Sequence, residues 1–372
     1  MHRTLKALLA ISVMVGTTLA TQQSEPGKPT SATQDEPLRL KSDLVSVTAA
    51  VTDRNGRAVR SLRADDFTVF EDGVRQKIAH FSPTEEPFTL MLLIDVSGST
   101  IDDIDLMKRA AANFITELRG EDRVGVIVFS GEVELIAEFT DSRESVLREV
   151  ESIVSPVSKS STHRFGSNTG TSYYDALYLA VAASPLKKAD SRKAIVCITD
   201  AVDSASKMGF EEVAPLVEKS DASVYILQLN TEEATLGWLL KDRKDPGYLD
   251  FSQSQVNRYY DAFDKESIDR HRDRRFITPL VRRDINAGLY EIARREAKQL
   301  CERTGGRVYP LAKLGDLAGV YKQVADDLRS QYLIGYYPSN DVHDGKWRKI
   351  RVELRRRDTT IRARQGYWAP GK

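Results

Sequence analysis

Between residues 88 and 330, uninterrupted apolar segments alternate with amphipathic segments, and this alternation restricts the possible folds strongly. The apolar segments include "FTLMLLIDV", "DRVGVIVFS", "KAIVCITD" and "SVYILQLN". The segments between them carry apolar residues at helical spacing, as at Ile104, Met107, Ala111, Phe114 and Leu118. Strands without a polar face are buried on both sides. The pattern therefore predicts an α/β fold with a doubly wound, mostly parallel sheet.

One pair of segments breaks the parallel pattern. "VFSGEVEL" joins two apolar segments through Ser130 and Gly131 alone. A parallel crossover needs about a dozen residues, so this pair is predicted to be an antiparallel hairpin.

Both ends of the chain have the texture of antiparallel strands. In residues 38–85, apolar and polar residues alternate, with turn signals at Asn55-Gly56 and Asp72-Gly73. Residues 331–372 contain three expected strands, "QYLIGYYP", "KWRKIRVELRR" and "TTIRARQGYW". Neither end has enough strands to bury its apolar face alone. We therefore expect one small β-sandwich built from both ends, with the α/β domain of residues 86–330 inserted into it.

Residues 231–286 interrupt the α/β rhythm with a highly charged segment that has no strand pattern. We interpret it as a partly helical insertion that precedes a helix opening near residue 287. Long loops inside compact domains are either functional or disordered, and both alternatives stay open here. Its aromatic and basic residues, such as Trp238 and Tyr259, favour a peripheral contact surface.

The first twenty residues have the pattern of a secretory signal peptide. Arg3 and Lys6 precede a short apolar stretch, and Thr18 and Ala20 have the spacing of a cleavage site. Residues 21–37 are polar and contain prolines, which is typical of a disordered leader. The protein is therefore expected to be secreted or periplasmic. A membrane anchor formed by an uncleaved N-terminus is the alternative. No later apolar stretch approaches the length needed to span a membrane.

Charge and cysteine content exclude several classes of protein. Lysine plus arginine and aspartate plus glutamate number 54 each, so nothing in the net charge indicates a nucleic-acid partner. The two cysteines, Cys197 and Cys301, are too few for a disulfide scaffold. Two buried thiols or a single bridge both remain possible.

Oxygen-bearing side chains gather where the predicted strands end. Asp95, Ser97 and Ser99 follow the first apolar strand, Thr171 precedes a predicted helix, and Asp200 ends another strand. Ligand sites in doubly wound sheets lie beyond the carboxyl ends of the strands. Carboxylates, hydroxyls and water suit a hard cation, Mg²⁺ above all, with Mn²⁺ or Ca²⁺ as alternatives. Zinc is disfavoured because histidine and cysteine are missing from the set.

The stretches "DVSGST", "GTSYYDAL" and "ITDAVDS" resemble the metal-ion-dependent adhesion site (MIDAS) of von Willebrand factor type A (VWFA) domains. The resemblance covers about residues 86–330, and the whole chain resembles the acidobacterial family of type A-related proteins. It implies that Asp95, Ser97 and Ser99 contact the metal directly, and that Thr171 and Asp200 do so directly or through water. Ala201 departs from the motif, where glycine is usual after the aspartate.

The sequence therefore predicts a metal-dependent, adhesion-type protein-binding module whose metal accepts an Asp or Glu carboxylate from a protein partner. A structural or assembly protein with a metal site unused in recognition is the alternative, and a metal-assisted hydrolase is a third hypothesis. Ser97-Gly98-Ser99 is not a hydrolase nucleophile elbow, and no phosphate-binding glycine loop is present, so we do not expect an enzyme. Asp175 is expected to pair locally or to cap its helix. Asp203 is expected to be a loop residue, with the outer shell of the metal as the alternative. His163 and Arg164 are expected to be solvated loop residues.

Overall fold

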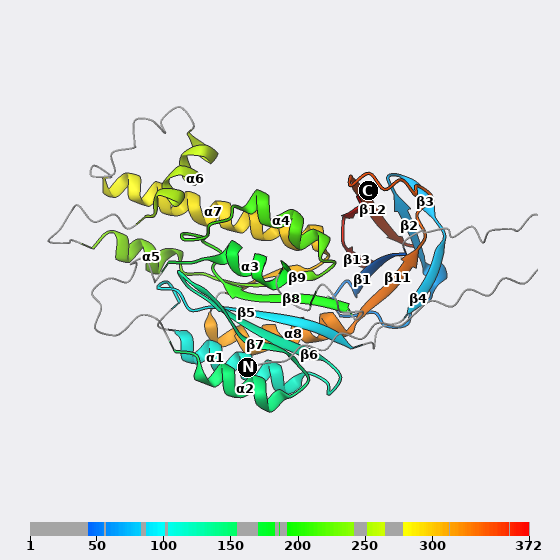
Figure 1. Cartoon of the computed structure of the whole chain (residues 1–372), viewed down its shortest axis with the longest axis horizontal. Coiled ribbons are helices and arrows are strands. Elements are labelled where there is room, and N and C mark those ends of the chain that lie inside the picture. The colour runs from blue at the N-terminus through cyan, green and yellow to red at the C-terminus, as the bar shows by residue number, and fades with distance from the viewer. Residues whose placement is uncertain are drawn as a thin grey trace, which may run out of the picture. The chain divides into compact units, whose positions relative to one another are not determined.

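A mixed six-stranded sheet runs through the central part of the chain (Figure 1). Its strands are β5 Phe88–Asp95, β6 Arg123–Phe129, β7 Val133–Thr140, β8 Arg192–Thr199, β9 Ser223–Leu229 and β10 Arg307–Leu311. They lie in the order β10-β9-β8-β5-β6-β7, and all neighbours are parallel except β6 and β7. The predictions of a mostly parallel sheet and of one antiparallel hairpin are confirmed.

The computed structural model describes only part of the sequence. The described residues are 44–55, 57–82, 87–100, 103–154, 170–182, 186, 192–241, 251–264, 278–311, 313–356 and 358–371. The predicted signal peptide and leader lie outside these residues, as do His163 and Arg164. No helix within the described ranges is long and apolar enough to cross a membrane.

Helices cover both faces of the six-stranded sheet (Figure 1). On one face lie α1 Ile104–Glu117, α2 Arg143–Ser152 and α8 Leu317–Arg329, and on the other lie α3 Tyr173–Ala182, α4 Phe210–Lys219 and α7 Pro279–Thr304. Side chains of β5 alternate between them. Leu90 and Leu92 belong to the hydrophobic cluster of α1 and α8, while Met91 and Leu93 belong to that of α3, α4 and α7. An apolar strand without a polar face is thus buried from both sides.

The charged insertion contributes two helices and the start of a third. They are α5 Glu232–Leu239, α6 Gln253–Phe263 and the first turns of α7. The prediction that α7 opens near residue 287 is wrong, because it begins at Pro279. Thr278 caps it by accepting a hydrogen bond from the Val281 amide (3.3 Å), and proline is favoured in the first turn. Buried apolar residues of this segment, including Leu239, Tyr260 and Ile285, form a hydrophobic cluster together with Leu289 of α7.

Strands from both ends of the chain pair with each other in two antiparallel sheets. From the N-terminal part come β1 Val45–Asp53, β2 Phe67–Glu71, β3 Val74–Gln76 and β4 Ile78–Ser82, and from the C-terminal part β11 Gln331–Tyr336, β12 Trp347–Leu354, β13 Thr359–Ala363 and β14 Gly366–Trp368. The sheet orders are β13-β1-β11-β4 and β14-β12-β2-β3. Two short 3-10 helices, η1 Ala64–Asp66 and η6 Leu314–Asp316, directly precede β2 and α8.

The single strand expected over "TTIRARQGYW" is in fact two strands in different sheets. β13 pairs with β1, while β14 pairs with β12. Between them, the Gln365 amide donates to the Arg303 carbonyl at the end of α7 (3.2 Å), so the chain turns toward the helix there. Gly366 permits the change of sheet, because an added Cβ would lie 2.4 Å from the Arg348 carbonyl oxygen.

One hydrophobic cluster is shared by the two antiparallel sheets. It contains Val47, Val69, Tyr332 and Ile334, all with no exposed surface. The Tyr332 hydroxyl also donates to the Val59 carbonyl (2.7 Å), which joins strand β11 to the loop after β1. Residues far apart in sequence therefore depend on each other for burial.

Both cysteines are buried and free, and they belong to the same hydrophobic cluster. Burial raises the pKa of the Cys197 and Cys301 thiols, which favours the inert neutral form.

The pairing of the two chain ends predicts the behaviour of a shortened chain. Removing everything after Arg329 takes away β11 and β13, which flank β1, and β12, which pairs with β2. The cluster around Val47 and Val69 would then face water. We expect this truncated chain to aggregate or to bind a hydrophobic dye, with the full chain as control. A soluble chain of residues 38–329 that unfolds in one cooperative transition would contradict the prediction.

Candidate metal site

The turn after β5 places Asp95, Ser97 and Ser99 together at the carboxyl edge of the sheet. Asp95 is fully buried, and its Oδ1 accepts a hydrogen bond from the Ser97 amide (3.0 Å). Thr100 closes the turn by donating from Oγ1 to the Asp95 carbonyl (2.9 Å). The hydroxyl oxygens of Ser97 and Ser99 lie 3.3 Å apart. The i, i+2, i+4 spacing thus brings three oxygen-bearing side chains to one turn.

Asp200, at the end of β8, meets this turn from the neighbouring strand. Its Oδ2 accepts a hydrogen bond from the Ser99 hydroxyl (2.9 Å), and its Oδ1 accepts one from the Val202 amide (2.9 Å). Thr199, one residue earlier, donates from Oγ1 to Asp95 Oδ2 (2.6 Å). Four of the five predicted site residues are therefore linked through hydrogen bonds across β5 and β8.

Thr171, the fifth predicted residue, is held by its backbone. Its amide donates to Ser204 Oγ (2.8 Å), and its carbonyl accepts from the Ser204 and Ala205 amides (2.9 and 3.1 Å). The side chain is buried, but no hydrogen bond in the described part of the chain links its hydroxyl to Asp95 or Asp200. Residues 155–169, which precede it, lie outside the described residues.

Ala201 adopts the backbone conformation for which glycine is usually needed. Its φ is 63°, in the left-handed region that L-residues occupy at a cost of roughly 1–2 kcal/mol. Its amide donates to Thr199 Oγ1 (2.9 Å), and its side chain is buried in the cluster of α3 and α4. The departure from the usual motif therefore does not prevent Asp200 from reaching the turn after β5.

Asp203 and Asp175 tie the loop after β8 to helix α3. Asp203 Oδ2 accepts from the Tyr173 amide (3.0 Å) at the start of α3. Asp175 accepts from the amides of Lys207 (3.0 Å) and Met208 (3.1 Å). Asp203, which lies in the loop as expected, also caps the start of α3, whereas Asp175 binds amides of a distant loop and neither pairs locally nor caps its own helix.

The two site carboxylates are buried together without a positive partner. Burial, and then the negative charge of Asp200, raise the pKa of Asp95 to about 7. Burial also raises the pKa of Asp200. No lysine, arginine or histidine within the described residues forms an ion pair with either. A divalent cation would supply the missing positive charge. The side-chain atoms that could coordinate it are all oxygens, so the residues present fit a hard cation.

Sequence reasoning missed three residues that support the carboxylates: Thr199, Thr231 and Tyr290. Thr231 Oγ1 donates to Asp200 Oδ2 (2.6 Å) and lies 2.7 Å from the Tyr290 hydroxyl. Thr199 and Thr231 both stand at carboxyl ends of strands, so the rule that identified Asp95 could have found them. Tyr290 lies inside the long helix α7, and no motif marks it.

No group of three or more His, Cys, Asp or Glu side chains with metal-binding geometry occurs among the described residues. The candidate site has only two such side chains, Asp95 and Asp200. The candidate metal centre therefore depends on hydroxyl oxygens and water as much as on charge.

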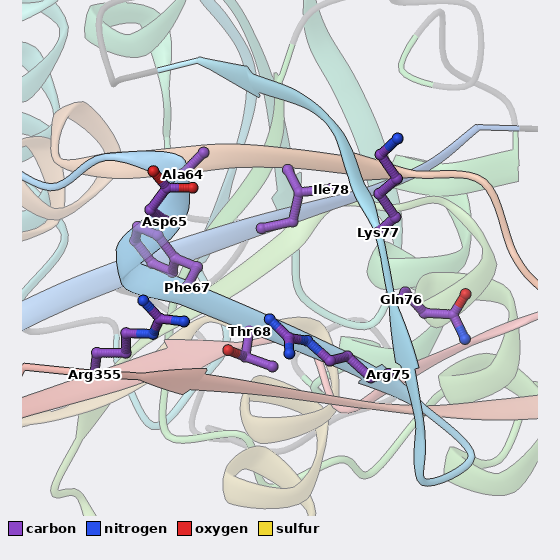
Figure 2. A pocket seen from close by; sticks show the side chains of 9 residues that line it. All are labelled: Ala64, Asp65, Phe67, Thr68, Arg75, Gln76, Lys77, Ile78 and Arg355. Atoms are coloured by element: carbon purple, nitrogen blue, oxygen red, sulfur yellow. The ribbon is translucent and has the colours of Figure 1, made fainter.

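A pocket of about 510 Å³ along β2, β3 and β4 is a different kind of site (Figure 2). It is lined by three basic side chains, Arg75, Lys77 and Arg355, all exposed. Its buried polar residue Gln76 is already paired, since its Nε2 donates to Ser339 Oγ (2.9 Å) and its Oε1 accepts from the Ser339 amide (3.0 Å). The pocket has a solvated basic rim, and we assign it no ligand.

The raised pKa of Asp95 predicts how the metal-free protein responds to pH. The folded pKa lies above the unfolded value, so the Asp95 contribution to stability is present below about pH 4 and is lost as pH rises through about 7. Asp95→Asn removes this dependence. In chelator at pH 8 we expect the variant to be more stable than wild type by roughly 2 kcal/mol, with the difference vanishing near pH 4.

Urea unfolding from pH 4 to 8 measures this difference, and Asp326→Asn on the exposed face of α8 is the control. A variant less stable than wild type at pH 8 in chelator would contradict the electrostatic account. Added Mg²⁺ is expected to stabilise wild type and to leave Asp95→Asn almost unchanged.

Comparison with known protein families gives a match to the region that contains these residues. The family model for the von Willebrand factor type A domain matches residues 90–202. The search of curated proteins found no significant match.

Several solved structures are similar to this chain. An aerotolerance-related membrane protein from Bacteroides fragilis shares 19% identity over 65% of this chain and 98% of its own, with a TM-score of 0.40. BatB from Bacteroides thetaiotaomicron shares 20% identity over 64% and 97%, with a TM-score of 0.39. Proximal thread matrix protein 1 from the mussel byssus, in a structure with a zinc-occupied MIDAS motif, shares 13% identity over 66% and 48%, with a TM-score of 0.39.

None of these structural likenesses identifies a function at such identities and TM-scores. The family model is more specific, and its range includes Asp95, Ser97, Ser99, Thr171 and Asp200. The resemblance to von Willebrand factor type A domains is confirmed by this match, which covers residues 90–202.

Proposed function

We propose that this protein is a metal-dependent protein-binding module that presents a divalent cation at the carboxyl edge of its six-stranded sheet. The observation that carries this proposal is the pair of buried carboxylates, Asp95 and Asp200, which lie among hydroxyl groups and have no basic partner among the residues that the structure describes. Asp95, Ser97 and Ser99 would bind the ion directly, with Thr171 and Asp200 direct or water-bridged. Mg²⁺ is the proposed ion, with Mn²⁺ or Ca²⁺ as alternatives.

The proposed partner group is a carboxylate from an Asp or Glu side chain. Two aspartates neutralise a divalent cation, and the serine and threonine hydroxyls add dipoles without charge. Such a shell leaves the ion electrophilic, so an incoming carboxylate gains more than a neutral carbonyl does. The metal would supply the contact, and the loops that carry Ser99 and Thr171 would shape access to it.

We also propose the domain organisation and location that fit this role. Residues 38–85 and 331–372 would form one small β-sandwich, and residues 86–330 would be a VWFA domain inserted into it, with the insertion at 231–286. The strand pairing between both chain ends and their shared hydrophobic cluster support this division. Residues 1–20 would direct the protein to the periplasm or outside the cell, and residues 21–37 would form its leader.

A structural or assembly role is the second candidate, because a buried metal can stabilise loops without contacting a partner.

A metal-assisted hydrolase is less well supported. In the described part of the chain, the groups that contact Asp95 and Asp200 are backbone amides and hydroxyls, and none of them is a histidine or a lysine that could act as a general base.

The carboxylate hypothesis is tested with paired peptide libraries that differ only by Asp or Asn at a fixed position. In Mg²⁺ we expect wild type to retain the Asp library over the Asn library. Chelator should abolish this preference, and moderate salt should only weaken it, because a coordinate contact is screened less than exposed charges are. Asp95→Asn should reduce retention about tenfold or more, since it removes ligand charge while keeping size.

Glu353→Gln, on the exposed face of β12, is the matched control for charge loss and should retain peptides as wild type does. If wild type in chelator, or Asp95→Asn in Mg²⁺, retains the Asp library as well as wild type in Mg²⁺ does, recognition takes place elsewhere on the protein. Mg²⁺ binding without any Asp preference would favour the structural role.

A further inference from the structure

A chain of hydroxyl groups runs from Asp200 into the helices that follow β9. Thr231 Oγ1 donates to Asp200 Oδ2 (2.6 Å). It also lies 2.7 Å from the Tyr290 hydroxyl oxygen, which in turn lies 3.0 Å from Thr235 Oγ1. Thr231 and Tyr290 are only 7% and 4% exposed. Thr235 belongs to α5 and Tyr290 to α7, so the chain connects the candidate metal site to the helices that begin in the charged insertion.

The ionised carboxylate fixes the direction of these hydrogen bonds. An ionised Asp200 can only accept, so Thr231 must donate its single hydroxyl proton to it. Tyr290 then donates to Thr231 and accepts from Thr235. Hydrogen bonds that point the same way along a chain strengthen one another, most of all at a buried site.

This arrangement leaves Asp200 little freedom. Its Oδ2 accepts from Ser99 and Thr231, and its Oδ1 accepts from the Val202 amide. A carboxylate has about four acceptor positions, so one remains for a metal ion or a metal-bound water. Loss of the Thr231 donor would free Oδ2 to turn away from this orientation.

A second, partly buried polar contact joins the helices of the same segment to helix α3. Arg258 on α6 donates from Nη2 to Glu296 Oε2 (2.8 Å) and to the Tyr174 hydroxyl (2.6 Å) at the start of α3. The side chains of Arg258 and Glu296 are 22% and 15% exposed. Helix α6 is therefore joined by polar contacts to α7, which carries Tyr290, and to the start of α3.

We propose that Thr231 and Tyr290 are positioning residues of the metal site, which makes the segment after β9 part of that site. This inference rests on the proposed function, because it assumes that Asp200 serves a bound cation. Partners that orient a metal ligand typically change metal affinity by about 10- to 100-fold when they are lost.

The test measures Mg²⁺ affinity by titration calorimetry and the Mg²⁺-dependent rise in Tm. Thr231→Val keeps the shape of the side chain and removes the donor, so we expect affinity to fall by about 10- to 100-fold. Thr231→Ser keeps the donor and should bind close to wild type. Tyr290→Phe removes the second hydroxyl and should cause a smaller loss, about tenfold or less.

Tyr336→Phe is the control for loss of a buried hydroxyl. It removes the hydrogen bond to Glu71 (2.7 Å) in the antiparallel sheets and should lower Tm without changing Mg²⁺ affinity. A role in packing alone would give the opposite pattern: the serine variant, which loses the methyl group of Thr231, would bind more weakly, and the valine variant, which keeps its shape, would bind as wild type does. Only the positioning role predicts rescue by serine.

The outcomes separate this inference from the proposed function. If wild type binds Mg²⁺, Asp95→Ala does not, and Thr231→Val and Tyr290→Phe bind as wild type does, only the positioning role is overturned. If wild type binds no divalent cation, the proposed function and this inference both fall. A loss in Thr231→Val that Thr231→Ser restores supports both.

Discussion

The burial of two like charges beside each other is the constraint on which this structure depends. Asp95 and Asp200 lie at the carboxyl ends of neighbouring strands, and neither is more than 2% exposed. Buried carboxylates are normally paired with a cation or neutralised by a proton. Here hydroxyl and amide donors satisfy part of each carboxylate, and the pKa of Asp95 rises to about 7. The metal-free site is therefore under electrostatic strain that a bound divalent ion would relieve.

The rest of the fold holds these two groups in place. Parallel pairing of β5 with β8 aligns the strand ends, and helices on both faces bury the strands so that only their carboxyl edge is polar. Helices α5 and α7 bring Thr235 and Tyr290 to the far side of Asp200. The antiparallel sheets contact other elements, through Trp368 to Glu218 of α4 and through Gln365 to the end of α7. The site and these sheets are thus joined by the same long helix.

Sequence patterns predicted the parts of this arrangement that depend on local chemistry. The apolar strands, the faces of α1 and α8, and the turn of Asp95, Ser97 and Ser99 follow from periodicity and spacing. The capping residue Thr278 and the proline after it also indicate that α7 begins at Pro279, but the charged residues around them obscure the helical pattern. Tyr290 could not be found, because its role depends on which face of a long helix meets β9. The separation of β13 from β14 likewise follows from contacts with α7 that no local pattern contains.

Anomalous diffraction from crystals grown with Mn²⁺ tests the central claim most directly. The account predicts one strong anomalous peak per chain at the carboxyl edge of the sheet. That peak should lie within direct coordination distance of Asp95, Ser97 and Ser99, with Asp200 bound to the ion directly or through a water. Asp95→Ala crystals should lack it. Wild-type crystals that show no peak at Asp95, while Mn²⁺ occupies another position or none, would contradict the claim that these buried carboxylates exist to hold a cation.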